Sequence, residues 1–202
     1  MLLSDLIRKK KLIIKTGLTF SGGINYSDQG NCYLIQSKDL LKEGDKKRLD
    51  LSELDQIDLK ISARSWFVQA GDVVILKKGG DWQAHLAGDV PEQTVIGQTF
   101  LLIRITGNKD ITPEFLSFYL NLPSTQMQLS AKSGGGKQAS ISKKDLEEIQ
   151  IPDLTDGEQQ QLMELAETIE DEKQLLLSLI DNRQQQLQKA IEMKLEASNE
   201  KN

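Results

Sequence analysis

The end of the chain constrains its fold more than any other part, because residues 155–195 contain no proline and no glycine after Gly157. Apolar residues recur there at three- and four-residue steps, which indicates one face of a long α-helix. Thr155 and Glu158 are spaced as a capping box that satisfies free N–H groups at a helix start. About 37 residues at 1.5 Å each predict a rod of roughly 55 Å. The apolar stripe consists of Leu162, Leu165, Ile169, Leu176, Leu179, Ile180, Leu187 and Ile191.

A helix with one apolar stripe needs a second surface to cover that stripe. We expect no later segment of this chain to fold back on it. We therefore expect a coiled coil with another molecule, in which the residues of the stripe form a dimerisation seam. Two antiparallel copies would bring the acidic residues 164–172 of one helix towards Lys189 and Lys194 of the other, and such an isologous homodimer closes at two chains.

The length of 202 residues suits one globular domain of about 150 residues followed by the rod. We assign residues 1–152 to the domain and 153–202 to the rod. A lone cysteine, Cys32, argues against a disulfide framework. We expect neither an export signal nor a membrane span, and hence a cytoplasmic protein, because no apolar run reaches about 18 residues and a basic run interrupts the first one.

The net charge of −5 conceals a gradient along the chain. Residues 1–80 hold 14 Lys and Arg against 10 Asp and Glu, whereas residues 151–202 hold 5 against 12. The acidic excess therefore sits on the rod, and the domain can still present a basic face to phosphates. The plain alternative for the rod is an exposed helix that is simply rich in Glu and Gln.

The first 152 residues predict a mixed α/β (α+β) domain. Turn signals and short apolar runs indicate strands, and Thr112 followed by Pro113 indicates a capped helix that Pro123 would close. Ser142 caps a shorter helix. The strands are expected at residues 33–35, 73–76, 95–96 and 99–105, the helices at 113–122 and 145–149, one amphipathic opening at 2–15, and a mixture of loop and short helix at 37–60.

Two lysines, Lys77 and Lys78, follow the apolar strand at residues 73–76 and precede two glycines. Lysines beside flexible backbone at the end of a strand are well placed to meet a phosphate. A glycine-rich loop between Lys132 and Ser140 has the same character, because its bare backbone N–H groups lie between lysines. The alternative is a flexible connector. The candidate loop residues are Ser133, Gly134, Gly135, Gly136, Lys137 and Gln138.

This loop is not a P-loop, since Ala131 and Gln138 stand where that motif needs a glycine and a Ser or Thr. For base reading, Arg64, Gln36 and Ser37 are candidates, because Arg and Gln pair bidentately with guanine and adenine edges. Ordinary surface polarity is the alternative for these three residues.

Catalysis has little support in the sequence, which contains neither a Pro-Pro pair nor a G-x-G-x-x-G fingerprint for a methyl donor. His85 is the single histidine, which excludes a two-histidine metal site, and we expect a structural role for it. Cys32 suits a buried apolar position better than that of a nucleophile. We expect no enzyme activity, no cofactor and no metal.

Residues 141–160 carry a serine cap, a Leu, an Ile-Pro and a Glu-Gln pair, ahead of a long helix and after a glycine-rich loop. In this order of parts the chain resembles the specificity (S) subunits of Type I restriction-modification systems. The opening residues 3–23 and the strand at 71–74 are also similar to that family's target-recognition domains. The resemblance implies a non-catalytic subunit that binds double-stranded DNA and recruits modification (methyltransferase) and restriction subunits.

One departure from the family pattern is large. Members usually carry two recognition domains and two long helices packed antiparallel, whereas this chain has one of each and resembles a half-length subunit. A homodimer would supply the second set and would imply a bipartite, palindromic DNA target. The alternative function is a coiled-coil interaction protein whose globular head binds another protein and never contacts DNA.

Overall fold

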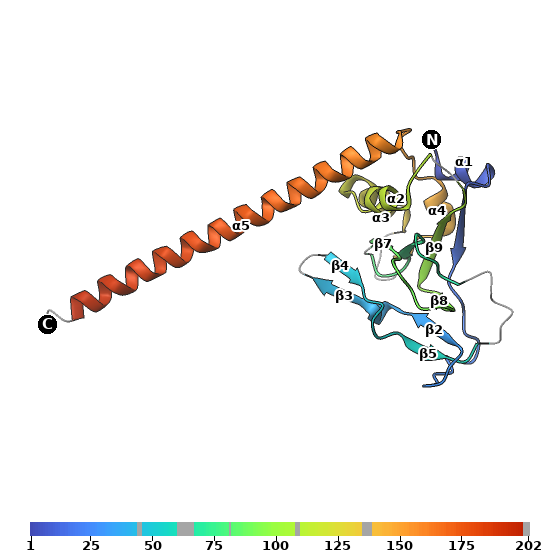
Figure 1. Ribbon diagram of the computed structural model, residues 1–202, viewed down its shortest axis with the longest axis horizontal. Coiled ribbons are helices and arrows are strands. Elements are labelled where there is room, and N and C mark those ends of the chain that lie inside the picture. Colours follow the sequence, from blue (N-terminus) through green and yellow to red (C-terminus); the bar gives the residue numbers. More distant parts are fainter. Residues whose placement is uncertain (44–45, 60–66, 81, 108–109, 135–138, 200–202) are drawn as a thin grey trace. The chain divides into compact units, whose positions relative to one another are not determined.

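The computed structural model describes residues 1–202 except 44–45, 60–66, 81, 108–109, 135–138 and 200–202. The chain forms two compact units, residues 1–159 and 160–202. We call the first unit the head, and the second holds most of one long helix. The head mixes short helices with three β-sheets (Figure 1), so the predicted α+β class with a long C-terminal helix is confirmed.

A four-stranded antiparallel sheet forms the centre of the head, in the order β1-β9-β6-β7. Helix α2 (Pro113–Leu120) packs against β6 and β7, while α1 (Leu3–Arg8) and α4 (Lys143–Glu147) pack against β1. The strands of this sheet are β1 (Leu12–Thr16), β6 (Val73–Leu76), β7 (Ala84–Leu86) and β9 (Phe100–Ile105).

A second sheet has the order β5-β2-β8, with β2 (Cys32–Ile35) antiparallel to β5 (Asp55–Ile57) and parallel to β8 (Thr94–Ile96). One core cluster joins the two sheets, because Ile35 and Ile96 pack with Val74 and Phe100. All four residues of β6 are buried. Burial on both faces of the strand explains why its sequence is a continuous apolar run rather than an alternating one.

The strands predicted near residues 33–35, 73–76, 95–96 and 99–105 are confirmed as β2, β6, β8 and β9. Arg104, which interrupts the last apolar run, donates to both carboxylate oxygens of Asp72 at 2.7 and 2.6 Å and to the Phe67 carbonyl at 2.6 Å. The hydrogen bonds to Asp72 raise the pKa of Arg104. This pair holds the turn before β6 against β9.

The segment at residues 37–60 was expected to be loop and short helix, and this prediction is wrong for the residues that form strands. After the short 3-10 helix η1 (Ser37–Asp39), strands β3 (Leu40–Glu43) and β4 (Lys46–Leu49) pair as a separate hairpin. The partly buried Leu40 and Leu49 are directly paired and pack on the core. The many charged residues of this hairpin hid the strand pattern.

Two further boundaries differ from the sequence predictions. The single amphipathic opening is divided into α1 and β1 by Lys10, whose positive φ of 57° ends the helix. Pro123 does not merely close α2; it is the first residue of α3 (Pro123–Lys132). A proline fits there because the first turn of a helix has no use for its missing N–H group.

The predicted helix caps are confirmed. Thr112 accepts from the Phe115 N–H at 3.2 Å, and Ser142 accepts from the Asp145 N–H at 3.3 Å. At the start of the long helix α5 (Asp156–Asn199), the Glu158 carboxylate accepts from the Thr155 N–H at 2.8 Å, while the Thr155 hydroxyl accepts from the Glu158 N–H at 3.3 Å. The hydrogen bonds from Thr155 lower the pKa of Glu158.

The first turn of α5 belongs to the head and is held by Gln159, which is buried. Its amide accepts from the Thr112 N–H at 2.9 Å and donates to the carbonyls of Asp110 and Leu154, each at 3.1 Å. The first residue of the chain is bonded to the segment that precedes α5, because the Met1 carbonyl accepts from the Ile151 N–H at 2.7 Å. These bonds anchor the segment that leads into the helix.

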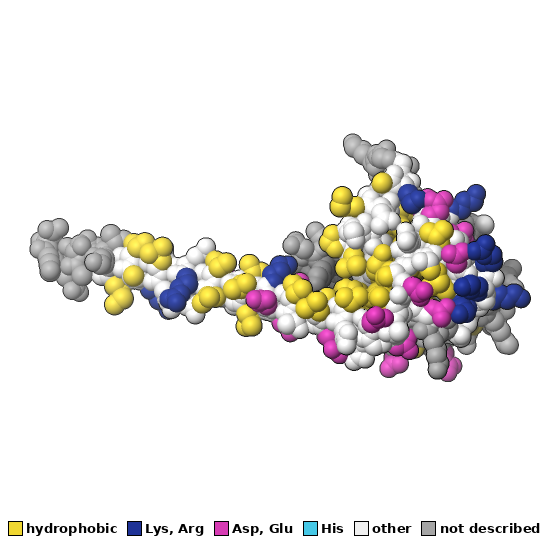
Figure 2. All heavy atoms as spheres, turned by 90° about the horizontal axis from the view of Figure 1, so that it is seen from above, with side chains coloured by type: hydrophobic (Ala, Val, Ile, Leu, Met, Phe, Trp, Pro, Cys, Tyr) yellow, Lys and Arg dark blue, Asp and Glu magenta, His cyan; other side chains and the backbone are white. Residues whose placement is uncertain are grey.

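From residue 160 onward, α5 carries large apolar side chains that are exposed in this chain (Figure 2). Every residue of the predicted stripe is among them. Its polar side chains satisfy one another within the helix, as in the hydrogen bonds from Gln160 to Glu164 and from Gln188 to Glu192, each 2.8 Å long. The apolar stripe is therefore the part of this unit that still lacks a covering surface within the described residues.

Candidate nucleic-acid interface

The two lysines at the end of β6 are held by backbone pairing on both sides. The Lys77 N–H donates to the Thr99 carbonyl at 2.8 Å, and the Lys77 carbonyl accepts from the Ile141 N–H at 2.9 Å. Lys78 forms a β-bridge with Ser140 and is exposed, whereas Lys77 is half-buried. Within the described part of the chain, neither ammonium group takes part in an ion pair. Both positive charges are therefore free to meet an external anion.

The glycine-rich loop returns to this same strand end. The Gly79 N–H donates to the Ala139 carbonyl at 3.2 Å, and the Ser140 N–H donates to the Ser133 carbonyl at 3.4 Å. Two candidate segments that lie more than 50 residues apart in the sequence thus form one surface. The middle of the loop, Gly135, Gly136, Lys137 and Gln138, lies outside the described residues.

Three glycines of this surface have left-handed backbone conformations, with φ of 104° at Gly79, 81° at Gly80 and 64° at Gly134. Apart from the neighbours in the chain, no atom of the described residues lies within 4 Å of the position that a Cβ would take at any of them. Glycine is therefore favoured here by the backbone conformation and not by crowding. Open backbone without side chains can approach another molecule closely, as the sequence suggested.

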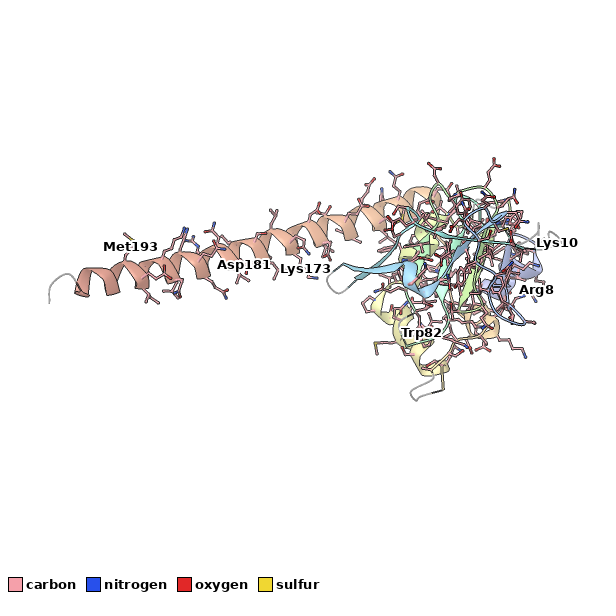
Figure 3. The ribbon with its side chains drawn as sticks, turned by 90° about the horizontal axis from the view of Figure 1, so that it is seen from below. Arg8, Lys10, Trp82, Lys173, Asp181 and Met193 are labelled. Atoms are coloured by element: carbon pink, nitrogen blue, oxygen red, sulfur yellow. The ribbon has the colours of Figure 1, made fainter. Side chains whose placement is uncertain are left out.

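Helix α3 supports the loop from the other side. The buried Trp82 (Figure 3) donates from Nε1 to the Ser130 hydroxyl at 3.2 Å, and the Gln126 amide donates to the Trp82 carbonyl at 3.0 Å. Lys132 at the end of α3 forms an ion pair with Glu148. The first residues of the glycine-rich loop therefore start from a fixed helix, next to the turn that follows Lys78.

A second group of predicted residues lies beside Thr99. The Ser37 hydroxyl donates to the Thr99 hydroxyl at 3.3 Å, and the Thr99 carbonyl is the acceptor of the Lys77 N–H. The exposed Ser37 is thus linked to the lysine surface through one residue. A hollow of about 360 Å³ opens here, lined by Phe20, Gly23, Ile24, Leu34, Gln36, Ser37, Lys38, Gly97, Gln98 and Thr99.

The side chain of Gln36, the other candidate base reader in this group, is already engaged. Its amide nitrogen donates to Asp55 at 2.8 Å, and its amide oxygen accepts from the Tyr26 hydroxyl at 3.2 Å. Base contact by Gln36 would require it to exchange these partners. The remaining candidate, Arg64, lies outside the described residues.

Sequence reasoning missed Lys38 and Thr99. Lys38 is exposed and forms an ion pair with Asp55 at 2.6 Å, and the hydrogen bond to Asp55 raises its pKa. The run Gln36-Ser37-Lys38 was a usable signal, because it adds a cation directly after two candidates. No feature of the local sequence pointed to Thr99, because its position beside the lysines depends on the hydrogen bond that its carbonyl accepts from the Lys77 N–H.

Two further residues considered in the sequence, His85 and Cys32, are buried. His85 is buried on β7, and Cys32 is buried on β2, where burial raises the pKa of its thiol. Among the described residues, no group of three or more His, Cys, Asp or Glu side chains is arranged to hold a metal ion. The helices of the described chain also include none that is both long and apolar enough to cross a membrane.

No family model and no curated protein matches this sequence. Solved structures do match the fold. The S subunit of a Type I restriction-modification system from M. genitalium aligns with a TM-score of 0.53 at 17% identity, over 90% of this chain and 41% of that chain. The HsdS subunit from Thermoanaerobacter tengcongensis aligns with a TM-score of 0.58 at 17% identity, over 85% of this chain and 37% of that one.

A third structure, which describes complex assembly and conformational transition of the type I R-M system, aligns with a TM-score of 0.51 at 18% identity. It covers 81% of this chain and 37% of that one. The chain has the fold of Type I specificity subunits. This fold confirms the resemblance to that family, and the chain spans 37–41% of the length of the three chains that it matches.

Proposed function

We propose that this chain is a DNA sequence-specificity subunit of a Type I restriction-modification system, with residues 1–152 as the target-recognition domain. The observation that carries the proposal is the pairing of Lys77 and Lys78 with Ile141 and Ser140 at one end of the glycine-rich loop, where Ser140 also bonds to Ser133 at the other end. Free ammonium groups beside bare, left-handed glycine backbone suit the contour and charge of a phosphate chain. The specificity-subunit fold supports the same reading.

On this surface, the lysines and Gly134 would contact phosphates and position the protein, together with the neighbouring loop residues Gly135, Gly136, Lys137 and Gln138. Ser37 and Gln36, beside the hollow, and Arg64 would reach base edges. The division follows from chemistry, because ammonium groups bind phosphates as point charges, whereas amide and guanidinium groups recognise bases in pairs of hydrogen bonds.

The chain would work without cofactor or metal and without chemistry of its own. Its role would be to bind the target and to recruit a modification (methyltransferase) subunit, with restriction subunits joining that complex in the cytoplasm. Purified alone, the protein should neither methylate nor cut DNA, and methylation should appear when a modification subunit is added. Methyl transfer by the chain alone would overturn this part of the proposal.

The exposed stripe on residues 160–193 would join two chains as an antiparallel homodimer. Covering six or seven of its eight Leu and Ile side chains offers on the order of 10 kcal/mol per chain before the entropy of association is subtracted. In such a dimer the two recognition domains lie at opposite ends of the helix pair and are related by a two-fold axis. The DNA target should then be bipartite and palindromic, because half-site geometry mirrors protein symmetry.

A gel-shift titration at several salt concentrations tests DNA binding by this surface. The variant Lys77→Ala/Lys78→Ala/Lys137→Ala should weaken binding to all sequences alike and reduce the slope of log K against log salt by about one unit per lost contact. A matched control is Lys143→Ala, whose ammonium already pairs with Glu147 at 3.6 Å. The control should leave the slope unchanged.

Equal binding by the triple variant and the unsubstituted protein would reject this surface as the phosphate contact. Failure of the unsubstituted protein to bind DNA, alone and with a modification subunit, would favour the other function: a head that binds protein, carried on a coiled coil.

A further inference from the structure

The exposed stripe of α5 contains an 11-residue repeat. A Leu is followed four residues later by an Ile, and this pair occurs three times at intervals of 11 residues. All six side chains are 46–64% exposed. The three pairs are Leu165 with Ile169, Leu176 with Ile180, and Leu187 with Ile191.

Eleven residues are close to three complete turns of an α-helix, which has 3.6 residues per turn. A straight helix therefore shifts this stripe by only about 20° per repeat, and in the sense opposite to a seven-residue repeat. Two helices joined along it would run nearly straight with a slight right-handed supercoil, instead of the left-handed supercoil of heptad coiled coils. The seam from Leu165 to Ile191 would be about 39 Å long.

The repeat is also symmetrical when it is read backwards. If two helices lie antiparallel with Ser178 of each at the same level, every Leu of one stripe faces an Ile of the other. Leu165 then faces the partner's Ile191, Ile169 faces the partner's Leu187, and Leu176 faces the partner's Ile180. A shift by one 11-residue repeat would leave only four of the six side chains of each helix opposite a counterpart.

Charge favours this antiparallel register over a parallel one. Residues 163–172 hold five Asp and Glu and no Lys or Arg. A parallel pair would place these five carboxylates against the same five of the partner. The antiparallel register places them beside residues 184–193 of the partner, which hold one Lys and one Glu and are neutral overall. Like charges along adjoining helices repel, so the parallel arrangement is disfavoured.

One pair of charges fits the register in detail. Glu172 and Arg183 occupy the same position in successive repeats, three residues after Ile169 and Ile180, and lie on the same edge of the stripe. A two-fold axis perpendicular to the helix pair keeps equivalent edges together. Because residue 172 lies level with the partner's residue 184, Glu172 comes within one residue step of the partner's Arg183, and the contact occurs twice.

We propose that α5 binds a second copy of itself in an antiparallel, nearly straight zipper centred on Ser178, closed by three Leu–Ile layers on each side of that centre and by reciprocal Glu172–Arg183 ion pairs. The proposal rests on the homodimer of the proposed function and adds its register, its supercoil and its specificity device. It also explains why the acidic half of the rod is not repelled by a second copy.

A charge-swap experiment tests the register. Glu172 and Arg183 are 11 residues, or roughly 16 Å, apart along one helix, so they cannot touch within a chain. Glu172→Arg and Arg183→Glu should each weaken the dimer roughly tenfold in sedimentation equilibrium, because each places like charges together at two sites. The double variant should return the dissociation constant to within about threefold of the unsubstituted value.

The control is Asp181→Arg, which makes the same change of charge about 120° round the helix from the stripe. It should leave the dissociation constant unchanged. Both altered positions and the control are exposed, so none of the substitutions threatens the helix itself. A double variant that is as weak as the single variants would overturn the register while leaving the homodimer intact.

A monomeric unsubstituted protein at micromolar concentration would instead refute the homodimer itself, and the rod would then be a docking helix for a different chain. A cross-linking readout separates antiparallel from parallel pairing. A mixture of Glu172→Cys and Arg183→Cys chains should form a disulfide-linked heterodimer that neither variant forms alone. The unsubstituted protein is the control, because its single cysteine, Cys32, is buried. Absence of that heterodimer from a dimeric mixture would count against the proposed register.

Discussion

The head and the rod bury their apolar residues in opposite ways. In the head, Trp82, Phe100 and Phe115 are almost completely inaccessible to solvent, and their contacts come from segments far apart in the sequence. On the rod, Leu176 and Ile180 remain more than half exposed. The difference teaches that the head buries its apolar residues within one chain, whereas in the proposed homodimer the rod would gain stability through association and would depend on protein concentration.

Polar groups show the same contrast. The ion pair between Arg104 and Asp72 joins β9 to the turn before β6, 32 residues away in the sequence. On the rod, Gln174 donates to Glu170 one turn earlier, at 3.0 Å. Local hydrogen bonds of this kind keep the outer faces of the helix in solvent. They leave the stripe as the surface of α5 that is suited to a partner.

The largest expected effect comes from substitutions that disrupt the proposed dimer seam of the rod and leave the head unchanged. Replacing Leu176 and Ile180 together by Asp puts four charges into the centre of the dimer seam. We expect the loss of about 6 kcal/mol or more of association free energy, so that sedimentation shows a monomer that binds half-sites weakly. The denaturation midpoint of the head should not move.

A matched control for this change is Leu175→Asp, because Leu175 lies outside the stripe although it is 71% exposed. It should stay dimeric. A double variant that still sediments as a dimer at micromolar concentration would show that the seam lies elsewhere on the helix.

The second-largest expected effect comes from a substitution that destabilises the core of the head and leaves the rod unchanged. Phe100 is fully buried between the two sheets, so Phe100→Ala leaves a cavity and should lower the free energy of unfolding of the head by about 3–5 kcal/mol. Urea denaturation followed by tryptophan fluorescence measures this loss, which should be independent of protein concentration. Met127→Ala, at a position 72% exposed, should change it by less than about 0.5 kcal/mol. A loss that varies with concentration would contradict the division between the two regions.

The smallest expected effect on stability is in the N-terminal cap of α5, where the sequence passes from the head to the rod. Thr155→Ala removes the hydroxyl that accepts from the Glu158 N–H and should cost about 1 kcal/mol. It should also raise the pKa of Glu158 part of the way back towards 4.5, because the bond from the backbone N–H of residue 155 remains. An NMR titration of the Glu158 carboxylate measures this shift.

The sign of the pH effect follows from that lowered pKa. The carboxylate contributes stability above its unfolded pKa, and this contribution is lost as pH falls through the lower folded value. Helix stability near the cap should therefore decline with acidification less steeply in Thr155→Ala than in the unsubstituted protein. An identical titration of Glu158 in the two proteins would show that the hydroxyl contributes nothing to the cap.

The sequence by itself determined the elements whose causes are local. The long helix follows from spacing and a capping box, β6 and β9 from continuous apolar runs, and the starts of α2 and α4 from Thr112 and Ser142, since each cause lies within a few residues of its effect. The two lysines and the glycine-rich loop could also be named as separate candidates. Each is unusual in its own composition, and neither needed a partner to be recognised.

Only the tertiary structure decided which segments that are distant in the sequence lie together. The hairpin of β3 and β4 was missed because its charged residues have no apolar alternation, and its stability comes from pairing Leu40 with Leu49 on a core supplied by other strands. The joining of Lys78 to Ser140, and of Ser37 to Lys77 through Thr99, rests on backbone and side-chain contacts between residues that lie tens of positions apart. Such contacts cost loop-closure entropy and are stabilised only by the complete core, so no short stretch of sequence encodes them.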